Sequence, residues 1–235
     1  LNYKKNASRT VNSRSAFTLI ELSIVLIIIG LLVAGITGGA ALINAAKLRS
    51  VMTDANANKI AANNFYSQYA ALPGDFDKAT GTGVAGDKDG VIEIGVGATS
   101  VLDEVRNAFN QLVDTGIIST VITLAGATAA DHVALTPGIE IPQQKDYSGL
   151  GFVFVGENNE NFVLGTGATI AAATDIAGLG TSIFKGDDAL AIDAKMDDGV
   201  ISTGDVRGNG TACSYASSTS ATCTVGWKLD IPTDI

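Results

Sequence analysis

The sequence predicts an α+β fold in which one long N-terminal helix packs on a small antiparallel sheet. Residues 17–43 form an almost uninterrupted apolar run. Residues 44–72 continue that run with apolar side chains at helical spacing and polar side chains between them. Beyond residue 150, short alternating segments separated by Gly and Asn indicate strands. The chain therefore divides into a leader (1–16), an apolar helix, its amphipathic continuation and a globular domain (73–235).

The apolar run has the length and composition of a transmembrane helix. Its only polar side chains are Thr18, Glu21, Ser23 and Thr37. At 1.5 Å per residue it extends for roughly 40 Å, more than the ~30 Å of bilayer hydrocarbon. Four basic residues and no acidic residue precede it. The positive-inside rule then predicts a cytoplasmic N-terminus and an extracytoplasmic C-terminal domain.

An ordinary secretory signal peptide is the competing interpretation of this segment. Such a peptide has a shorter apolar core, followed by small residues at the cleavage site. The chain has such residues at 39–41 and 44–46. The length of the run and Glu21 count against this interpretation, because a carboxylate in hydrocarbon costs about 3 kcal/mol even on the most lenient scale. An acid within a membrane helix is by default a functional residue.

The residues around Glu21 read Ser-Ala-Phe-Thr-Leu-Ile-Glu-Leu over 15–22. This segment, after a basic leader and before an apolar run, resembles the cleavage and methylation signature of type IV pilins and type II secretion pseudopilins. The resemblance implies cleavage by a prepilin peptidase between Ala16 and Phe17, N-methylation of Phe17, and Glu21 as the fifth mature residue. The family usually has Gly where this chain has Ala16. The chain also begins with Leu1 and not Met, which leaves open a non-standard start codon or a truncation.

The resemblance implies a structural protein and not an enzyme. It predicts a prepilin that is held in the inner membrane, processed, and polymerised into a helical filament with its own copies or paralogous pilins by an inner-membrane assembly platform. In that filament Glu21 would pair with the Phe17 ammonium of a neighbour and set the register, unless it only reaches toward the membrane surface. A membrane-anchored periplasmic binding or enzymatic domain is the alternative. The sequence does not separate pilus from pseudopilus.

The pattern beyond residue 100 predicts the remaining elements. Helices are expected at 101–114 and 187–198, and a hairpin at 150–155 and 161–164. Further β segments are expected at 201–206 and 224–229, with Trp227 in the core. His132 is the only histidine and has no nearby nucleophile pattern, so no catalytic triad is supported.

Charge and cysteine content add two expectations for the globular domain. From residue 47 onward there are 11 basic and 23 acidic residues, a net charge of −12, so direct binding of nucleic acid is not expected. Cys213 and Cys223 flank a polar, Ser/Thr-rich loop. A disulfide there would stabilise the fold by about 2–3 kcal/mol, whereas two unrelated buried thiols are the alternative.

Two acidic segments raise the question of calcium, although no cofactor is required by the predicted function. Asp193, Asp197 and Asp198 are candidate ligands, as some pseudopilins bind calcium near the C-terminus. Helix capping and turn formation by Asp, without a metal, is the other interpretation of these residues. Residues 87–93 resemble the middle of an EF-hand loop but lack both end ligands, which favours a plain turn.

Overall fold

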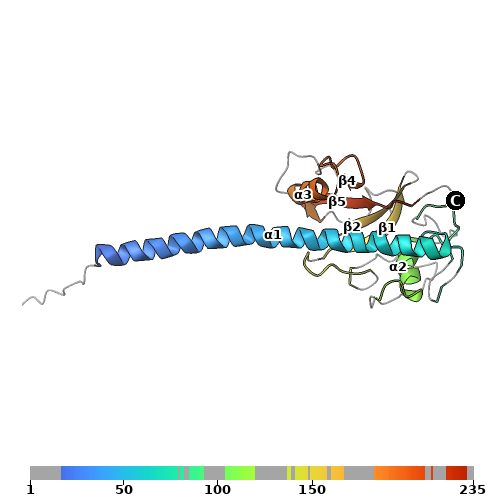
Figure 1. The fold of residues 1–235 in the computed structure, drawn as a ribbon, viewed down its shortest axis with the longest axis horizontal. Coiled ribbons are helices and arrows are strands. Elements are labelled where there is room, and N and C mark those ends of the chain that lie inside the picture. Colours follow the sequence, from blue (N-terminus) through green and yellow to red (C-terminus); the bar gives the residue numbers. More distant parts are fainter. Residues whose placement is uncertain are drawn as a thin grey trace, which may run out of the picture. The chain divides into compact units, whose positions relative to one another are not determined.

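The computed structural model of the chain describes residues 17–78, 80–81, 85–92, 104–119, 137–138, 141–147, 149–157, 160–166, 183–209, 213 and 221–231. It confirms an α+β fold with one long N-terminal helix and a five-stranded antiparallel sheet (Figure 1). The chain forms two compact units, Leu1–Ala45 and Ala46–Ile235, and the helix α1 (Leu19–Tyr69) contributes to both. The predicted leader 1–16 lies outside the described residues.

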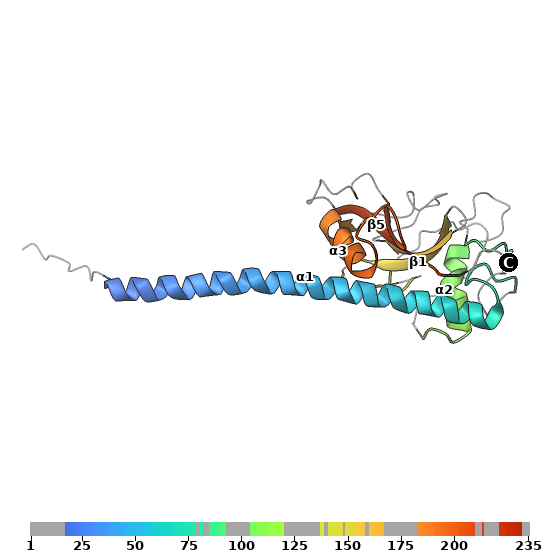
Figure 2. The ribbon, with the colours of Figure 1, turned by 45° about the horizontal axis from the view of Figure 1, so that its top comes forward.

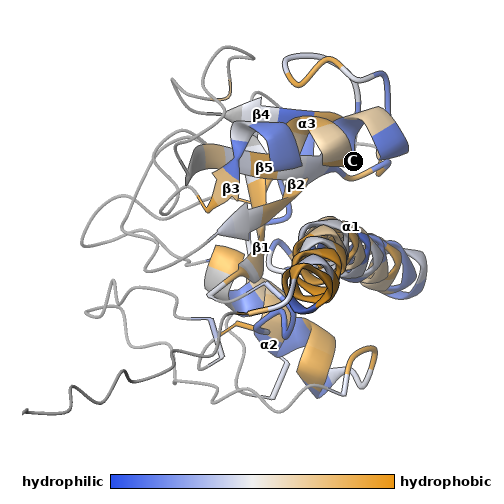
Figure 3. Ribbon diagram, turned by 90° about the vertical axis from the view of Figure 1, so that its left-hand side faces the viewer, coloured by the Kyte–Doolittle hydropathy of each residue, from blue (hydrophilic) through white to orange (hydrophobic). Residues whose placement is uncertain are grey.

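The part of α1 in the first unit is apolar on all sides. From Leu19 to Ile43 its large hydrophobic side chains are all exposed. Figure 3 colours the nearer turns of α1 as mostly hydrophobic. This is the only helix in the described part of the chain that is long and apolar enough to cross a membrane.

The part of α1 in the second unit buries one face in the core of the domain. Its buried residues recur at helical spacing: Leu48, Val51, Ala55, Ala61, Ala62 and Phe65. This half of the helix runs beside β1 and α2 (Figures 1 and 2). The helix ends at Tyr69, and Ala70 has a positive φ of 51° that turns the chain out of the helix. Beyond the turn, Phe76 packs edge-on against Phe65, with ring centroids 5.7 Å apart.

The sheet is built around β5 (Ala221–Lys228), which pairs antiparallel with three other strands. These are β2 (Glu160–Thr166), β3 (Phe184–Lys185) and β4 (Val206–Asn209). The strand β1 (Gly151–Glu157) completes the predicted hairpin with β2. The predicted strands 150–155, 161–164 and 224–229 are therefore confirmed. The segment 201–206 is wrong as a strand, because 201–205 forms a turn and pairing begins only at Val206.

Two shorter helices cover parts of this sheet. The helix α2 (Glu104–Asp114) packs on β1, and its Phe109 ring lies 5.0 Å from that of Phe154. The helix α3 (Gly186–Met196) packs on β3, β4 and β5. Both helices were predicted, and residues 101–103 of the first lie outside the described residues.

Trp227 lies in the core of the second unit, as predicted. It is 1% exposed, with its ring centroid 5.8 Å from that of Phe152. Its indole Nε1 donates a hydrogen bond to the sulfur of Met196, 3.2 Å away. Cys213 and Cys223 form the predicted disulfide, which ties β5 to Cys213.

Candidate functional site

Glu21 takes part in a capping box at the start of α1. The backbone amide and the hydroxyl of Thr18 both donate to Glu21 Oε2 at 2.8 Å, and the Glu21 amide lies 3.4 Å from the Thr18 hydroxyl. This reciprocal arrangement satisfies backbone donors that the first turn of a helix leaves unpaired. From sequence, Glu21 was interpreted only as a charge in an apolar run. The Thr-x-x-Glu spacing was the signal that could have revealed the second role.

The Glu21 carboxylate keeps capacity for a further partner. Both Thr18 bonds end on Oε2, and Oε1 accepts no hydrogen bond from any residue that the structure describes. Glu21 is also the only ionisable side chain between Phe17 and Ile43. One exposed charge thus lies at the start of a long, exposed apolar surface, four residues after Phe17, which is 79% exposed. Ala16, the other half of the predicted cleavage junction, lies outside the described residues.

Residues 11–37 match the family described as the prokaryotic N-terminal methylation motif. The chain carries this motif. It is the signature of type IV pilins and pseudopilins, and it confirms the resemblance that the sequence suggested. The motif and the apolar helix together indicate a membrane-anchored, pilin-like precursor. No curated protein and no solved structure matches the chain.

A second group of predicted residues lies at the end of α3. One carboxylate oxygen from each of Asp193, Asp197 and Asp198 lies within 4.8 Å of the others. The structure therefore brings together all three residues that the sequence singled out.

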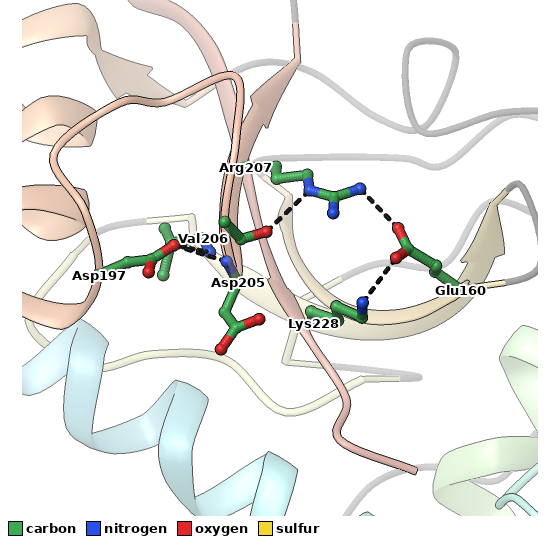
Figure 4. Close-up of polar contacts among 7 residues, drawn as sticks. Glu160, Asp197, Asp205, Val206, Arg207 and Lys228 are labelled. Carbon is green, nitrogen blue, oxygen red and sulfur yellow. Dashed lines mark hydrogen bonds and ion pairs between the residues drawn. The ribbon is translucent and has the colours of Figure 1, made fainter. Parts of the chain in front are cut away.

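Two of these aspartates organise the turn that follows α3. Asp197 Oδ2 accepts hydrogen bonds from the backbone amides of Asp205 at 2.5 Å and Val206 at 3.1 Å (Figure 4). Asp198 accepts bonds from the Val200 amide at 2.7 Å and from a threonine hydroxyl at 2.8 Å. These bonds are what the turn-forming interpretation predicts for both residues.

The loop closes tightly around Asp197. A Cβ at Gly204, whose φ is +78°, would lie 1.9 Å from Asp197 Oδ2. Only glycine adopts this conformation without strain and leaves room for the carboxylate. The amides of Asp205 and Val206 bond to Asp197, and strand pairing in β4 begins only at Val206. This explains why the predicted strand 201–206 begins too early.

Asp193 differs from the other two aspartates of this group. It is fully buried, and neither of its carboxylate oxygens accepts a hydrogen bond within the described part of the chain. Burial is the main cause that raises the pKa of Asp193, and the negative charges of Asp198 and Asp197 raise it further. The Gly199 backbone has a smaller, lowering effect on that pKa.

A further acidic group, not predicted from the sequence, lies around Asp75. Oxygens of Asp75, Asp87 and Glu104 lie within 4.8 Å of one another. Asp75 is fully buried and accepts bonds from the amides of Asp89 at 3.1 Å and Gly90 at 3.0 Å. Burial, aided by the charge of Asp89, raises the pKa of Asp75 to about 6. The sequence does not reveal this group, because its members come from three separate segments.

Asp87 and Asp89 form the local bonds that the plain-turn interpretation predicts. The Asp89 amide donates to Asp87 Oδ1 at 3.3 Å, and the Val91 amide donates to Asp89 Oδ1 at 2.9 Å. Side chains that bond to a backbone amide two residues further on are typical of Asx turns. Residues 93–100, which would hold the last ligand of such a loop, lie outside the described residues.

A cavity of about 480 Å³ lies between α1 and the segment 142–146. Ser50 donates to Asp146 Oδ2 at 2.6 Å and accepts a bond from Gln144 Nε2 at 2.8 Å. Burial is the main cause that raises the pKa of Asp54, which also lines the cavity. These bonds attach the loop to the helix.

His132, the only histidine, lies outside the described residues.

Glu160 joins three strands of the sheet through two ion pairs (Figure 4). Lys228 Nζ on β5 lies 2.6 Å from Glu160 Oε1, and Arg207 Nη1 on β4 lies 2.5 Å from Oε2. The hydrogen bond from Lys228, followed by that from Arg207, lowers the pKa of Glu160. The three side chains are partly exposed, so the two ion pairs stabilise the fold only modestly. Their role is to link the three strands.

Proposed function

We propose that the protein is a structural subunit of a type IV pilus or a type II secretion pseudopilus, and that it is not an enzyme. A prepilin peptidase cleaves it between Ala16 and Phe17, and Phe17 is N-methylated. The mature chain is held in the inner membrane, with its N-terminus cytoplasmic and its C-terminal domain periplasmic. An inner-membrane assembly platform then adds it to a filament of its own copies or of paralogous pilins.

The observation that carries this proposal is the exposed apolar half of α1 with its single charge. A helix that is apolar on all sides is stable only in lipid or among other apolar helices. Because exposed apolar surface is unfavourable by about 25 cal/mol per Å², residues 19–43 require such surroundings. Both the membrane and a filament core provide them, and the methylation motif lies on this same segment.

Glu21 supplies the register between neighbouring subunits. Cleavage before Phe17 creates an α-ammonium four residues from Glu21, and methylation retains its positive charge. Thr18 occupies only Oε2, which leaves Oε1 for the ammonium of a neighbouring subunit. In an apolar bundle this pairing is strong, and an unpaired charge is costly. Subunits therefore add in the position where each Glu21 meets a neighbouring Phe17.

Because Glu21 has both a charge and a capping role, variants at Glu21 and Thr18 can test the two roles separately. Glu21→Gln removes the charge but keeps a side chain that is compatible with the capping box, whereas Thr18→Val keeps the charge and removes the capping hydroxyl. In cells that lack the wild-type copy, we expect Glu21→Gln subunits to be cleaved and to accumulate as mature monomers. Their amount in purified filaments should fall more than tenfold.

The matched variant separates charge from helix capping. Thr18→Val should weaken the first turn by about 1 kcal/mol and change incorporation by no more than about threefold. Glu21→Leu should insert into the membrane at least as well as wild type and fail at the same step as Glu21→Gln. Wild-type incorporation of Glu21→Gln would contradict the register role and favour a simple anchor. An equal loss with Thr18→Val would assign Glu21 to capping alone.

A further inference from the structure

The cavity between α1 and the segment 142–146 combines acidic side chains with apolar ones. Its volume is about 480 Å³, and Asp54 and Asp146 both line it. The apolar part of the lining is formed by Ile118, Pro142 and Phe152. The cavity opens at the surface, because Asp146 is exposed. Pockets of about 300–1,000 Å³ hold small molecules, so one long side chain from outside fits into this cavity.

Neither acid in the cavity has an ion-pair partner in the described part of the chain. Asp54 and Asp146 form no ion pair with any Lys or Arg that the structure describes. Asp146 Oδ2 accepts a hydrogen bond from Ser50, whereas no described residue donates to Asp146 Oδ1. Burial raises the pKa of Asp54 and the charge of Asp146 raises it further, against smaller lowering effects of Gln144 and Lys145. A positive charge placed between the two acids would therefore stabilise both carboxylates.

The lining suits the side chain of an arginine. A guanidinium presents five N–H donors in a planar fork and bonds to carboxylates with two parallel hydrogen bonds. Its methylene groups pack along apolar side chains while the charged head reaches polar groups. Arginine is also more weakly hydrated than lysine, which makes it the better cation for a partly buried contact.

Arg49 is a cation that its own chain leaves without a partner. It is exposed on α1 and forms no ion pair with a residue that the structure describes. Arg49 precedes Asp54 by five residues, and at 3.6 residues per turn the two positions lie about 140° apart around the helix axis. Arg49 therefore lies on a side of α1 away from the cavity of its own chain, where another copy can reach it.

The stagger between neighbouring subunits brings this arginine to the cavity of another copy. This step rests on the filament proposed above, in which Glu21 meets the Phe17 of a neighbour. Such a neighbour is displaced by four residues, and parallel copies of one helix keep the same stagger along their length. Arg49 of the neighbour then lies one residue, about 1.5 Å along the axis, from the level of Asp54. A long side chain covers that distance easily.

We propose that the cavity receives Arg49 of a neighbouring copy of the chain, whose guanidinium pairs with Asp54 and Asp146. Each subunit then donates one arginine and accepts another, so the contact repeats along the filament. The contact also selects the neighbour, because a subunit without a base at this position would leave both carboxylates unpaired.

Charge reversal in cells that lack the wild-type copy tests the pair. Arg49→Glu and Asp54→Lys each place like charges together at the contact, so the amount of each variant in purified filaments should fall at least about tenfold. Lys47→Glu is the matched control, because it makes the same charge change on the same exposed part of α1. Residues two apart do not share a helix face, so this control should change incorporation by no more than about threefold.

Co-expression of the two single variants shows whether the pair joins two subunits. In a filament that alternates Arg49→Glu with Asp54→Lys, every contact between subunits again joins opposite charges. Filaments should return to within about threefold of the wild-type amount and contain both variants by mass spectrometry. This rescue also shows that both variants fold. A pair within one chain would be restored only by combining the two substitutions in the same chain.

Several outcomes would overturn this contact and leave the proposed filament subunit standing. They are normal incorporation of Arg49→Glu or Asp54→Lys alone, an equal loss with Lys47→Glu, and absence of rescue on co-expression. A different result would contradict the proposed function itself. If wild-type cells make no filament that contains the chain, both the filament subunit and the contact that rests on it are wrong.

Discussion

The two halves of α1 belong to one continuous helix but meet opposite conditions. Before residue 44 its large apolar side chains are all exposed, and the described chain supplies no partner for them. After residue 45 the helix buries one face, including Val51, Ala55 and Phe65, each at 0% exposure. The second half is therefore stabilised by the protein's own domain. The first half requires apolar surroundings from outside the described chain, such as lipid or other apolar helices.

Composition explains this difference. The first half has apolar residues on every side, with Glu21 as its only ionisable residue, whereas the second half alternates apolar residues with Asn, Asp and Lys. An amphipathic helix needs one apolar neighbour, and a helix that is apolar on all sides needs to be surrounded. The two halves should therefore respond differently to the same kind of mutation, which the following predictions use.

Truncation of a large side chain should show the largest contrast between the halves. Phe65→Ala, in the second half, removes a fully buried ring that packs against Tyr69 and Phe76 and should lower the free energy of unfolding by about 3–5 kcal/mol. Leu26→Ala, in the first half, alters a side chain that is 70% exposed and should leave it unchanged. Guanidinium unfolding in micelles, followed by Trp227 fluorescence, measures both. Equal destabilisation by the two variants would contradict the distinction.

Loss of the disulfide should affect only the globular unit. Reduction, or replacement of Cys213 and Cys223 by Ser, should lower the free energy of unfolding by about 2–3 kcal/mol, because a closed loop of about ten residues restricts the unfolded chain. Membrane extraction of the chain should not change, since the apolar half of α1 contains no cysteine. Unfolding curves with and without reductant test this prediction, and coincident curves would argue against a stabilising bridge.

Asp75 should give an effect that depends on pH. Its folded pKa of about 6 lies above the ordinary aspartate value, so the folded state holds this proton more tightly than the unfolded state. Stability from this group is highest below about pH 4, falls by about 3 kcal/mol in total as the pH rises through about 6, and is constant above about pH 7. Asp75→Asn should lack this decrease.

Wild type and Asp75→Asn need to be compared at each pH. The lowered pKa of Glu160 causes loss of stability as the pH falls below its ordinary value, but both proteins share that contribution. The difference between their unfolding free energies isolates Asp75. A difference that does not change between pH 4 and pH 6 would show that the buried carboxylate has an ordinary pKa.

Local patterns predicted most of the fold. The hairpin β1–β2, the strand β5, the helices α2 and α3 and the buried Trp227 all follow from periodicity and turn residues. The error at 201–205 arose because Asp197 captures two backbone amides across the turn, an interaction between residues eight and nine apart that alternation of apolar residues does not reveal. The two-residue strand β3 is too short to have a pattern.

The candidate sites were predictable to different degrees. The region of Glu21 is a contiguous motif, so sequence alone located it, although its bond with Thr18 was overlooked. The three aspartates at the end of α3 are close in sequence and were also found. Whether Asp193 has a partner depends on how α3 packs on the sheet, and sequence spacing does not determine that. The group around Asp75 depends entirely on tertiary contacts with Glu104.

The mature N-terminus is the most direct test of the account. Mass spectrometry of the protein from the membranes of its native host should find a chain that begins at Phe17 and carries one methyl group on its α-amine. That result requires both cleavage after Ala16 and retention of the apolar half of α1. A mature chain that begins beyond Gly39 would mean that the apolar segment is removed as an ordinary signal peptide, and it would contradict both the anchor and the filament.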